Sequence, residues 1–108
     1  EPHRICAAME TWTARNHRNV ELVPFRSEDA LWRSFTPGLF RAAFVGWGDT
    51  QGFLCARRLR EEDSACRVVL VDDTDRYAIR GIRIHLTYYL VRPLDEDQLC
   101  KAIERIFE

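Results

Sequence analysis

The chain has 108 residues, of which 16 are Lys or Arg and 17 are Asp or Glu, so its formal net charge is −1. This length supports one domain with a single core, and the mixed charge provides no general basic surface for nucleic acid or anionic membranes. No apolar run approaches the roughly 20 residues needed to span a bilayer, and the first residues carry no signal-peptide pattern.

The first third of the chain alternates between helix and strand signals. Ile5, Met9 and Trp12 follow helical spacing, and an early Pro suits the first turn of a helix. A β-branched run follows, but Pro24 cannot donate to a ladder and so favours an edge strand. Ser27 is placed to cap a short helix. We therefore predict a helix over 2–16, an edge strand over 20–25 and a helix that ends at residue 35.

A buried strand and a second long helix are predicted for the middle of the chain. Pro37-Gly38 indicates a turn, and the apolar run from Leu39 to Val45 predicts a strand that ends at Gly46. A polar loop follows, in which Asp49 or Thr50 would cap a helix running to residue 61.

The other predicted elements are arranged around the segment from 67 to 93. Val68 to Val71 form an uninterrupted aliphatic run closed by Asp72, which is typical of a buried parallel strand. A helix over 77–85 and a strand over 87–91 complete a βαβ unit, whose crossover is almost always right-handed. Since the carboxyl ends of parallel strands meet at one edge of a sheet, Asp72 and Arg92 are predicted to lie at the same edge.

The last helix has the strongest boundary signals. Asp95 and Gln98 match a capping box, and Leu94 is placed to pack on Leu99 as a hydrophobic staple. Leu99, Ile103 and Ile106 then form an inward stripe.

Two stretches carry a family resemblance: Val68-Val-Leu-Val-Asp-Asp-Thr-Asp-Arg-Tyr-Ala78 and Tyr88-Tyr-Leu-Val-Arg-Pro-Leu94. They resemble the receiver domain of response regulators, in particular the receivers that precede LytTR-type DNA-binding domains. The resemblance implies one domain over 1–108 with a three-layer α/β/α, flavodoxin-like fold, whose five parallel strands run in the order 2-1-3-4-5. Such receivers typically continue with Glu-Pro after the acidic end of their central first strand, and this chain opens with Glu-Pro. We therefore expect that strand to lie outside this sequence, the alternative being that another segment or chain supplies it.

The resemblance also implies a chemistry, and three positions of this chain depart from it. A working receiver phosphorylates an Asp at the end of its third strand, with Mg²⁺, a hydroxyl and a Lys stabilising the phosphoryl group. The matching positions are Gly46, Asp72 and Arg92, and the loop after Gly46 is about two residues short. Gly46 has no side chain to phosphorylate, Asp72 replaces the hydroxyl, and Arg92 keeps the charge with a different reach. We expect no enzymatic activity, and neither bound Mg²⁺ nor another metal.

Four further hypotheses concern this edge, each with a plainer alternative. Arg92 and Asp72 either pair across the emptied site or point separately into water. Tyr89 occupies the place of the family's switch aromatic, or is simply a half-buried strand residue. Asp49 is either a displaced phosphoacceptor or a helix cap. Asp73 and Asp75 either join Asp72 in a metal site or remain solvated.

The same resemblance indicates a homodimer through the face built by the fourth helix, fifth strand and fifth helix of the family. A mixture of aromatic and Arg residues on this face is typical of interfaces, although an ordinary solvated helix face is the alternative. The candidate residues are Tyr77, Ile79, Arg80, Arg83, Tyr88 and Lys101.

The function expected from the sequence is that of a pseudo-receiver, a receiver-like module without phosphorylation chemistry. It would have its ancestry in partnership with a sensor histidine kinase and would regulate a C-terminal LytTR domain in transcription control, with DNA bound only by that other domain. The alternatives are an active receiver phosphorylated on Asp49 or an upstream Asp, and a domain that senses a small anion or metabolite. The four cysteines form no Cys-x-x-Cys pair, which together with the absence of membrane signals leads us to expect a cytoplasmic protein.

Overall fold

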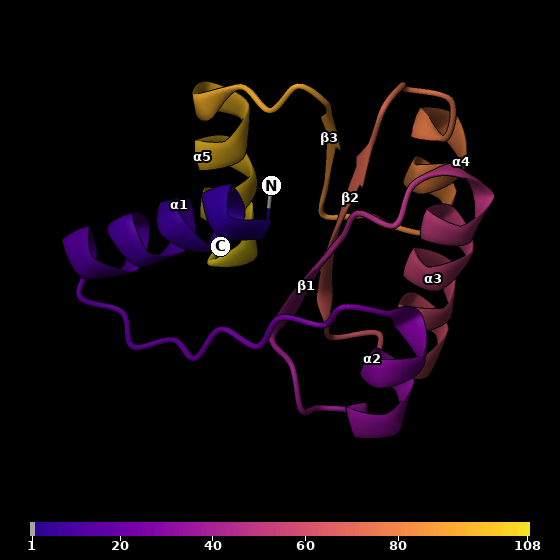
Figure 1. Cartoon of the computed structure of the whole chain (residues 1–108), viewed down its shortest axis with the longest axis horizontal. Coiled ribbons are helices and arrows are strands. Elements are labelled where there is room, and N and C mark those ends of the chain that lie inside the picture. The colour runs from indigo at the N-terminus through magenta and orange to yellow at the C-terminus, as the bar shows by residue number, and fades with distance from the viewer. Residues whose placement is uncertain (1) are drawn as a thin grey trace.

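A three-stranded parallel sheet with helices on both faces forms the framework of the protein (Figure 1). The structure is a computed structural model and describes residues 2–108. The prediction of an α/β fold with a parallel sheet is confirmed. The elements in chain order are α1 (Pro2–Arg15), α2 (Glu28–Ser34), β1 (Ala42–Val45), α3 (Asp49–Glu62), β2 (Arg67–Asp72), α4 (Ala78–Arg83), β3 (Tyr88–Val91) and α5 (Glu96–Ile106).

The middle strand of the sheet is β2, which pairs with β1 on one side and β3 on the other. Phe44 lies opposite Val69 in the first pair, and Val69 lies opposite Tyr88 in the second. Every residue of β2 from Val68 to Asp72 is buried, as its uninterrupted apolar sequence predicts for a parallel strand covered on both faces.

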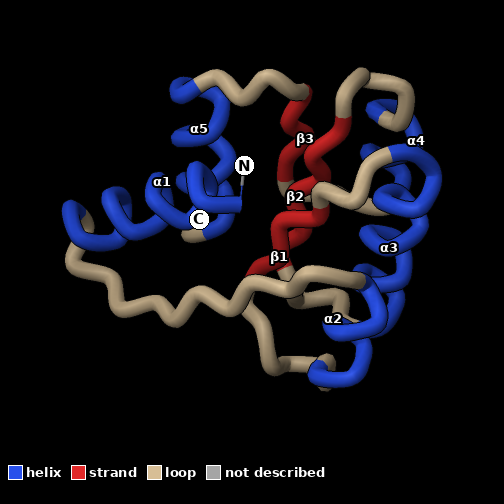
Figure 2. The backbone as a smooth tube through the Cα atoms, in the orientation of Figure 1, coloured by secondary structure: helices blue, strands red, loops and turns tan. Residues whose placement is uncertain are grey.

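Helices lie on both sides of the strands (Figure 2), and a hydrophobic cluster packs against each face of the sheet. Val68 and Leu70 of β2 point into the cluster that α3 covers, whereas Val69 and Val71 point into the cluster that α1 and α5 cover. The alternation follows from the two-residue period of a strand. The first and last helices are joined in the second cluster, where the rings of Trp12 and Phe107 stack with centroids 4.7 Å apart.

The predicted edge strand over 20–25 is wrong, because these residues form an extended connection with no ladder. Val20 and Val23 are 38% and 46% exposed, and Pro24 has no N–H to donate. Strand propensity alone does not hold a segment in a sheet when no neighbouring backbone pairs with it. β1 is also shorter than predicted, since the N–H of Leu39 bonds to the carbonyl of Thr36 at 2.9 Å and so belongs to the preceding turn.

Helix caps were predicted with mixed success. Ser27 caps α2, its hydroxyl accepting from the N–H of Ala30 at 3.2 Å. Asp95 likewise caps α5, but its bond comes from the N–H of Asp97 at 3.2 Å. The capping box predicted with Gln98 is wrong in its partner, because the Gln98 side chain accepts from the Tyr88 hydroxyl at 2.7 Å.

The cap predicted for α3 is wrong. Gly48 is its N-cap residue, with a φ of 85° that favours glycine, and no side chain caps the helix. Thr50 and Asp49 instead turn toward the segment after β2, where Thr50 bonds Tyr77 and Asp49 pairs with Arg76. No helix within residues 2–108 has the length and apolar composition required to cross a bilayer.

Candidate functional site

Gly46, Asp72 and Arg92 come together at the carboxyl edge of the sheet, each at or directly after the end of a different strand. One guanidinium nitrogen of Arg92, Nη2, donates to the carbonyl of Gly46 at 2.8 Å. The backbone N–H of Arg92 bonds to the carbonyl of Asp72, also at 2.8 Å. The prediction that Asp72 and Arg92 share this edge is therefore confirmed.

Asp72 is a buried carboxylate, only 1% exposed, and both of its oxygens have partners. Oδ1 accepts from the N–H of Asp73 at 2.8 Å, and Oδ2 lies 3.2 Å from Nε of Arg76. The hydroxyl of Tyr89 lies 3.4 Å from Oδ2. A buried carboxylate is tolerated only when it is paired and hydrogen-bonded, and this arrangement meets that condition.

The direct pair predicted between Arg92 and Asp72 stays a prediction, and each of the two residues has an ion pair with another residue of this edge. The carboxylate that Nη1 of Arg92 contacts is that of Asp73, at 3.3 Å. Asp72 is paired with Arg76, four residues later in the turn that leads to α4. The side chain of Arg92 reaches across the strand ends to Gly46, whereas Arg76 lies directly beside Asp72.

Arg76 is the residue of this edge that the sequence analysis missed. Its Nη1 pairs with Oδ1 of Asp49 at 3.0 Å, so one guanidinium bridges the start of α3 and the end of β2. Desolvation acts to lower the pKa of Arg76, but the carboxylates of Asp72 and Asp49 outweigh it and raise the pKa. The spacing of four residues between Asp72 and Arg76 was the available signal.

Tyr89 lies with its hydroxyl over the loop between β2 and α4. The hydroxyl donates to the carbonyl of Thr74 at 2.8 Å and accepts from the N–H of Tyr77 at 3.4 Å. Burial raises the pKa of Tyr89, and the nearby carboxylate of Asp72 acts in the same direction. The ring thus connects the edge strand β3 to the segment that begins α4.

Asp49 is the first residue of α3, with a φ of 49°, and its side chain is 84% exposed. The alternative in which it caps the helix is excluded by the N-cap position of Gly48. Asp73 and Asp75 are exposed loop residues. Within residues 2–108, no group of three or more His, Cys, Asp or Glu is arranged to hold a metal ion.

One candidate for the proposed dimer face is buried in the core. Tyr77 is only 8% exposed, its ring stacks on Phe53 with centroids 4.8 Å apart, and its hydroxyl bonds Thr50 at 2.8 Å. Tyr77 is therefore a core residue, and its selection as a surface candidate was wrong. Ile79 is 71% exposed as predicted, and Ile82, which was missed, is 74% exposed. The remaining candidates are exposed or half-buried: Arg80, Arg83, Lys101 and Tyr88.

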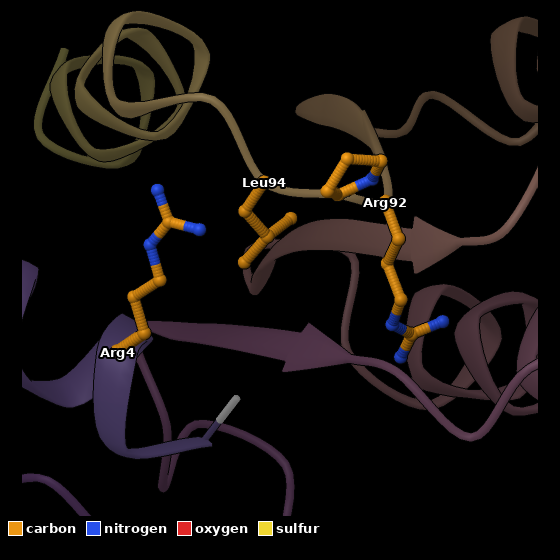
Figure 3. A pocket seen from close by; sticks show the side chains of 4 residues that line it. Arg4, Arg92 and Leu94 are labelled. Carbon is orange, nitrogen blue, oxygen red and sulfur yellow. The ribbon is translucent and has the colours of Figure 1, made fainter.

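A shallow cavity of about 520 Å³ lies between α1 and the connection from β3 to α5 (Figure 3). It is lined by Arg4, Arg92, Pro93 and Leu94. Two guanidinium groups beside one cavity are a feature expected of an anion site. Nε and Nη2 of Arg4, however, both donate to Oε1 of Glu96, at 3.1 Å and 2.8 Å, which offsets its charge.

Comparison with the profiles of known protein families and with curated proteins found no match.

Proposed function

We propose that this chain is a pseudo-receiver with a three-layer flavodoxin-like fold, in which internal contacts occupy the edge where receivers carry out phosphoryl transfer. The proposal combines the sequence resemblance with the parallel sheet and with the position of Gly46, Asp72 and Arg92 at one edge. Phosphoryl transfer depends on positioned charges around an acceptor, and here the position that would hold the acceptor is a glycine.

The contact between Arg92 and Gly46 is the observation that carries the proposal. In the family resemblance, Arg92 stands where a Lys would bind the phosphoryl oxygens. Its Nη2 instead lies 2.8 Å from the backbone carbonyl of Gly46, the residue at the acceptor position. A second nitrogen contacts Asp73. The cation is therefore engaged with protein oxygens at the place where a phosphoryl group would have to enter.

In this proposal the domain acts by binding a second copy of itself and catalyses no reaction. The exposed apolar residues of α4 and the charged face of α5 would pair two copies of the chain, and the dimer would regulate a C-terminal LytTR DNA-binding domain. The domain would derive from receivers that partner a sensor histidine kinase, and would itself contact no DNA. The exposed Ile79 and Ile82, three residues apart on α4, support such a surface, because the core of an interface is more apolar than the rest of the protein surface.

A second candidate function is supported by the cavity between Arg4 and Arg92. A small anion or metabolite could bind there if Glu96 released Arg4, and binding would then report on the same edge of the sheet. The ion pairs already present at both arginines make this the weaker candidate.

The test of the main proposal is the intact mass of the protein after incubation with acetyl phosphate or phosphoramidate and Mg²⁺. We expect no added phosphoryl mass, because Gly46 offers no carboxylate and Asp72 already binds Arg76. A conventional receiver treated in parallel serves as the positive control.

Asp49 is the residue whose labelling would contradict the proposal, since its exposed carboxylate is accessible to the reagent. A labile gain of one phosphoryl group that disappears in Asp49→Asn would establish an unconventional active receiver. A gain that persists in Asp49→Asn would place the acceptor at another carboxylate and would equally overturn the pseudo-receiver.

A further inference from the structure

We infer that Arg76 is an internal electrostatic clasp that fixes the start of α4 permanently, in the role that a removable phosphoryl group has in a regulated receiver. This inference rests on the proposed function for its meaning, but its geometry is independent of it. One guanidinium joins Asp49 of α3 to Asp72 of β2, and Arg76 itself lies two residues before α4. The Arg76 side chain therefore connects α3 and β2 to the loop that leads into α4.

The two halves of the clasp differ in exposure. The Asp72 side chain is 2% exposed and that of Arg76 is 40% exposed, so solvent screens their attraction less than it screens the pair with Asp49, whose side chain is 84% exposed. The pair with the buried Asp72 provides most of the attraction, and the exposed Asp49 adds a second contact at 3.0 Å. Removal of Arg76 would take away the cation that lies 3.2 Å from the buried Oδ2 of Asp72, which is an unfavourable change.

Contacts of the residues on either side of Arg76 also restrict the position of the start of α4. Tyr77 follows Arg76 directly and is held by Phe53 and Thr50 of α3, while the Tyr89 hydroxyl bonds the carbonyl of Thr74. A loop with partners on α3, β2 and β3 has one preferred arrangement. Release of the guanidinium would loosen the loop and, with it, the position of the exposed residues on α4.

A phosphoryl group would achieve the same result by bridging a cation and a hydroxyl at this edge for as long as the bond lasted. Arg76 provides a charge that cannot be removed, because a guanidinium stays protonated at all physiological pH values. The chain would accordingly present α4 in one state, without a signal-dependent switch at this edge.

Hydrogen–deuterium exchange of the whole chain tests the clasp in Arg76→Gln. We expect amides of residues 74–85 to exchange at least about ten-fold faster than in the unaltered protein, while amides of β2 and α5 keep their protection. Arg57→Gln is the matched control, because it removes the same charge from the exposed surface of α3, outside residues 74–85 and outside the proposed dimer face. In the unaltered protein, 0.5 M salt compared with 0.05 M should accelerate exchange in the same segment, because it screens the exposed Asp49 pair.

Equal exchange of residues 74–85 in the unaltered protein, Arg76→Gln and Arg57→Gln would overturn the inference. If Arg76→Gln does not fold, Asp49→Asn takes its place, since it removes only the exposed half and should give a smaller acceleration in the same residues. Unchanged exchange in a folded Asp49→Asn would then count against the bridge. Arg76→Lys should restore protection only in part, because an ammonium lacks the planar fork that reaches both carboxylates.

The clasp and the pseudo-receiver fail in different experiments. Phosphoryl labelling of a protein whose residues 74–85 respond to Arg76→Gln would refute the pseudo-receiver and leave the clasp intact. If the protein takes up no phosphoryl group and residues 74–85 exchange equally fast with and without Arg76, the clasp is refuted and the pseudo-receiver is left intact.

Discussion

At the scale of single residues, Asp63 shows how one buried carboxylate fixes a turn. It is 9% exposed and follows the end of α3. Its Oδ2 accepts from the N–H of Gly38 at 2.8 Å, and its Oδ1 accepts from the N–H of Ala65 at 3.1 Å. The bond from Gly38 is the largest of several backbone bonds that lower the pKa of Asp63 below 3.8. The side chain thereby ties the Pro37-Gly38 turn to the start of β2.

We predict that Asp63→Asn lowers the free energy of unfolding at pH 7 by about 1–2 kcal/mol, because an amide offers one acceptor oxygen to two backbone donors. The pKa of Asp63 is lower in the folded protein than in the unfolded chain. Its contribution is therefore present above pH 3.8 and is lost as the pH falls through the folded value. Urea unfolding at pH 7 and at pH 3 measures the difference, which should shrink in acid. Glu62→Gln, at the exposed end of the same helix, should show neither effect.

At the scale of elements, Arg60 of α3 holds the far end of α4. Its Nε donates to the carbonyl of Ile84 at 3.2 Å, and its Nη2 donates to that of His85 at 2.8 Å. Its Nη1 donates to the carbonyls of Ser64 and Cys66, both at 2.8 Å. The guanidinium satisfies carbonyls that the end of a short helix leaves without partners in the helix itself. α3 is thus joined to the segment before β2 and to the segment after α4, at the end of the sheet opposite the edge where Arg76 lies.

Arg60→Lys should lower the free energy of unfolding by about 1–3 kcal/mol, because one ammonium cannot reach all four carbonyls that the guanidinium binds. Arg57→Lys provides a matched control, since Arg57 is exposed and makes only a 3.7 Å pair with Glu61. Urea midpoints of both variants, with unchanged slopes, would provide the comparison. Equal midpoints would show that solvent replaces the four bonds without loss.

Elements could be predicted from sequence where their own residues determine burial. The apolar run of β2 and the stripe of α5 are both buried as expected, because helix and strand periods place successive side chains on known faces. The strand over 20–25 failed because a strand needs a neighbouring backbone, which local sequence does not encode. Tyr77 was misplaced for a related reason, since its burial depends on Phe53 of α3.

For the candidate site too, the sequence predicts which residues share an edge but not which side chains pair. Strand ends determine that Asp72 and Arg92 share one edge, and a sequence reveals strand ends. The partner of each charge depends on side-chain reach and on loop geometry. The bond between Arg76 and Asp49 joins residues 27 positions apart, across a turn that begins with a positive φ at Gly48.

At the scale of the whole molecule, the proposed dimer should depend on α4. Ile79 and Ile82 are its two most exposed apolar residues, and Arg80 and Arg83 lie beside them. We predict that the double variant Ile79→Asp, Ile82→Asp raises the dissociation constant of a homodimer at least about ten-fold, because charge replaces apolar contact at the interface centre. Sedimentation equilibrium over a range of protein concentrations measures this constant.

The control for this prediction is Leu54→Asp, which adds a charge to the exposed surface of α3, where Leu54 is 43% exposed. Leu54→Asp should leave association unchanged. A protein that stays monomeric at all concentrations, or a dimer that tolerates the double variant, would show that α4 is not the interface.

The contact between the first and last helices has a consequence for the entropy of folding. Each strand pair of the sheet closes a loop containing a single helix, whereas the ion pair of Arg4 with Glu96 joins residues 92 positions apart. Loop closure costs about 0.6 kcal/mol more for each doubling of loop length, so docking α1 on α5 costs about 1 kcal/mol more than forming either strand pair. The stacked rings of Trp12 and Phe107 are the contacts that offset this cost.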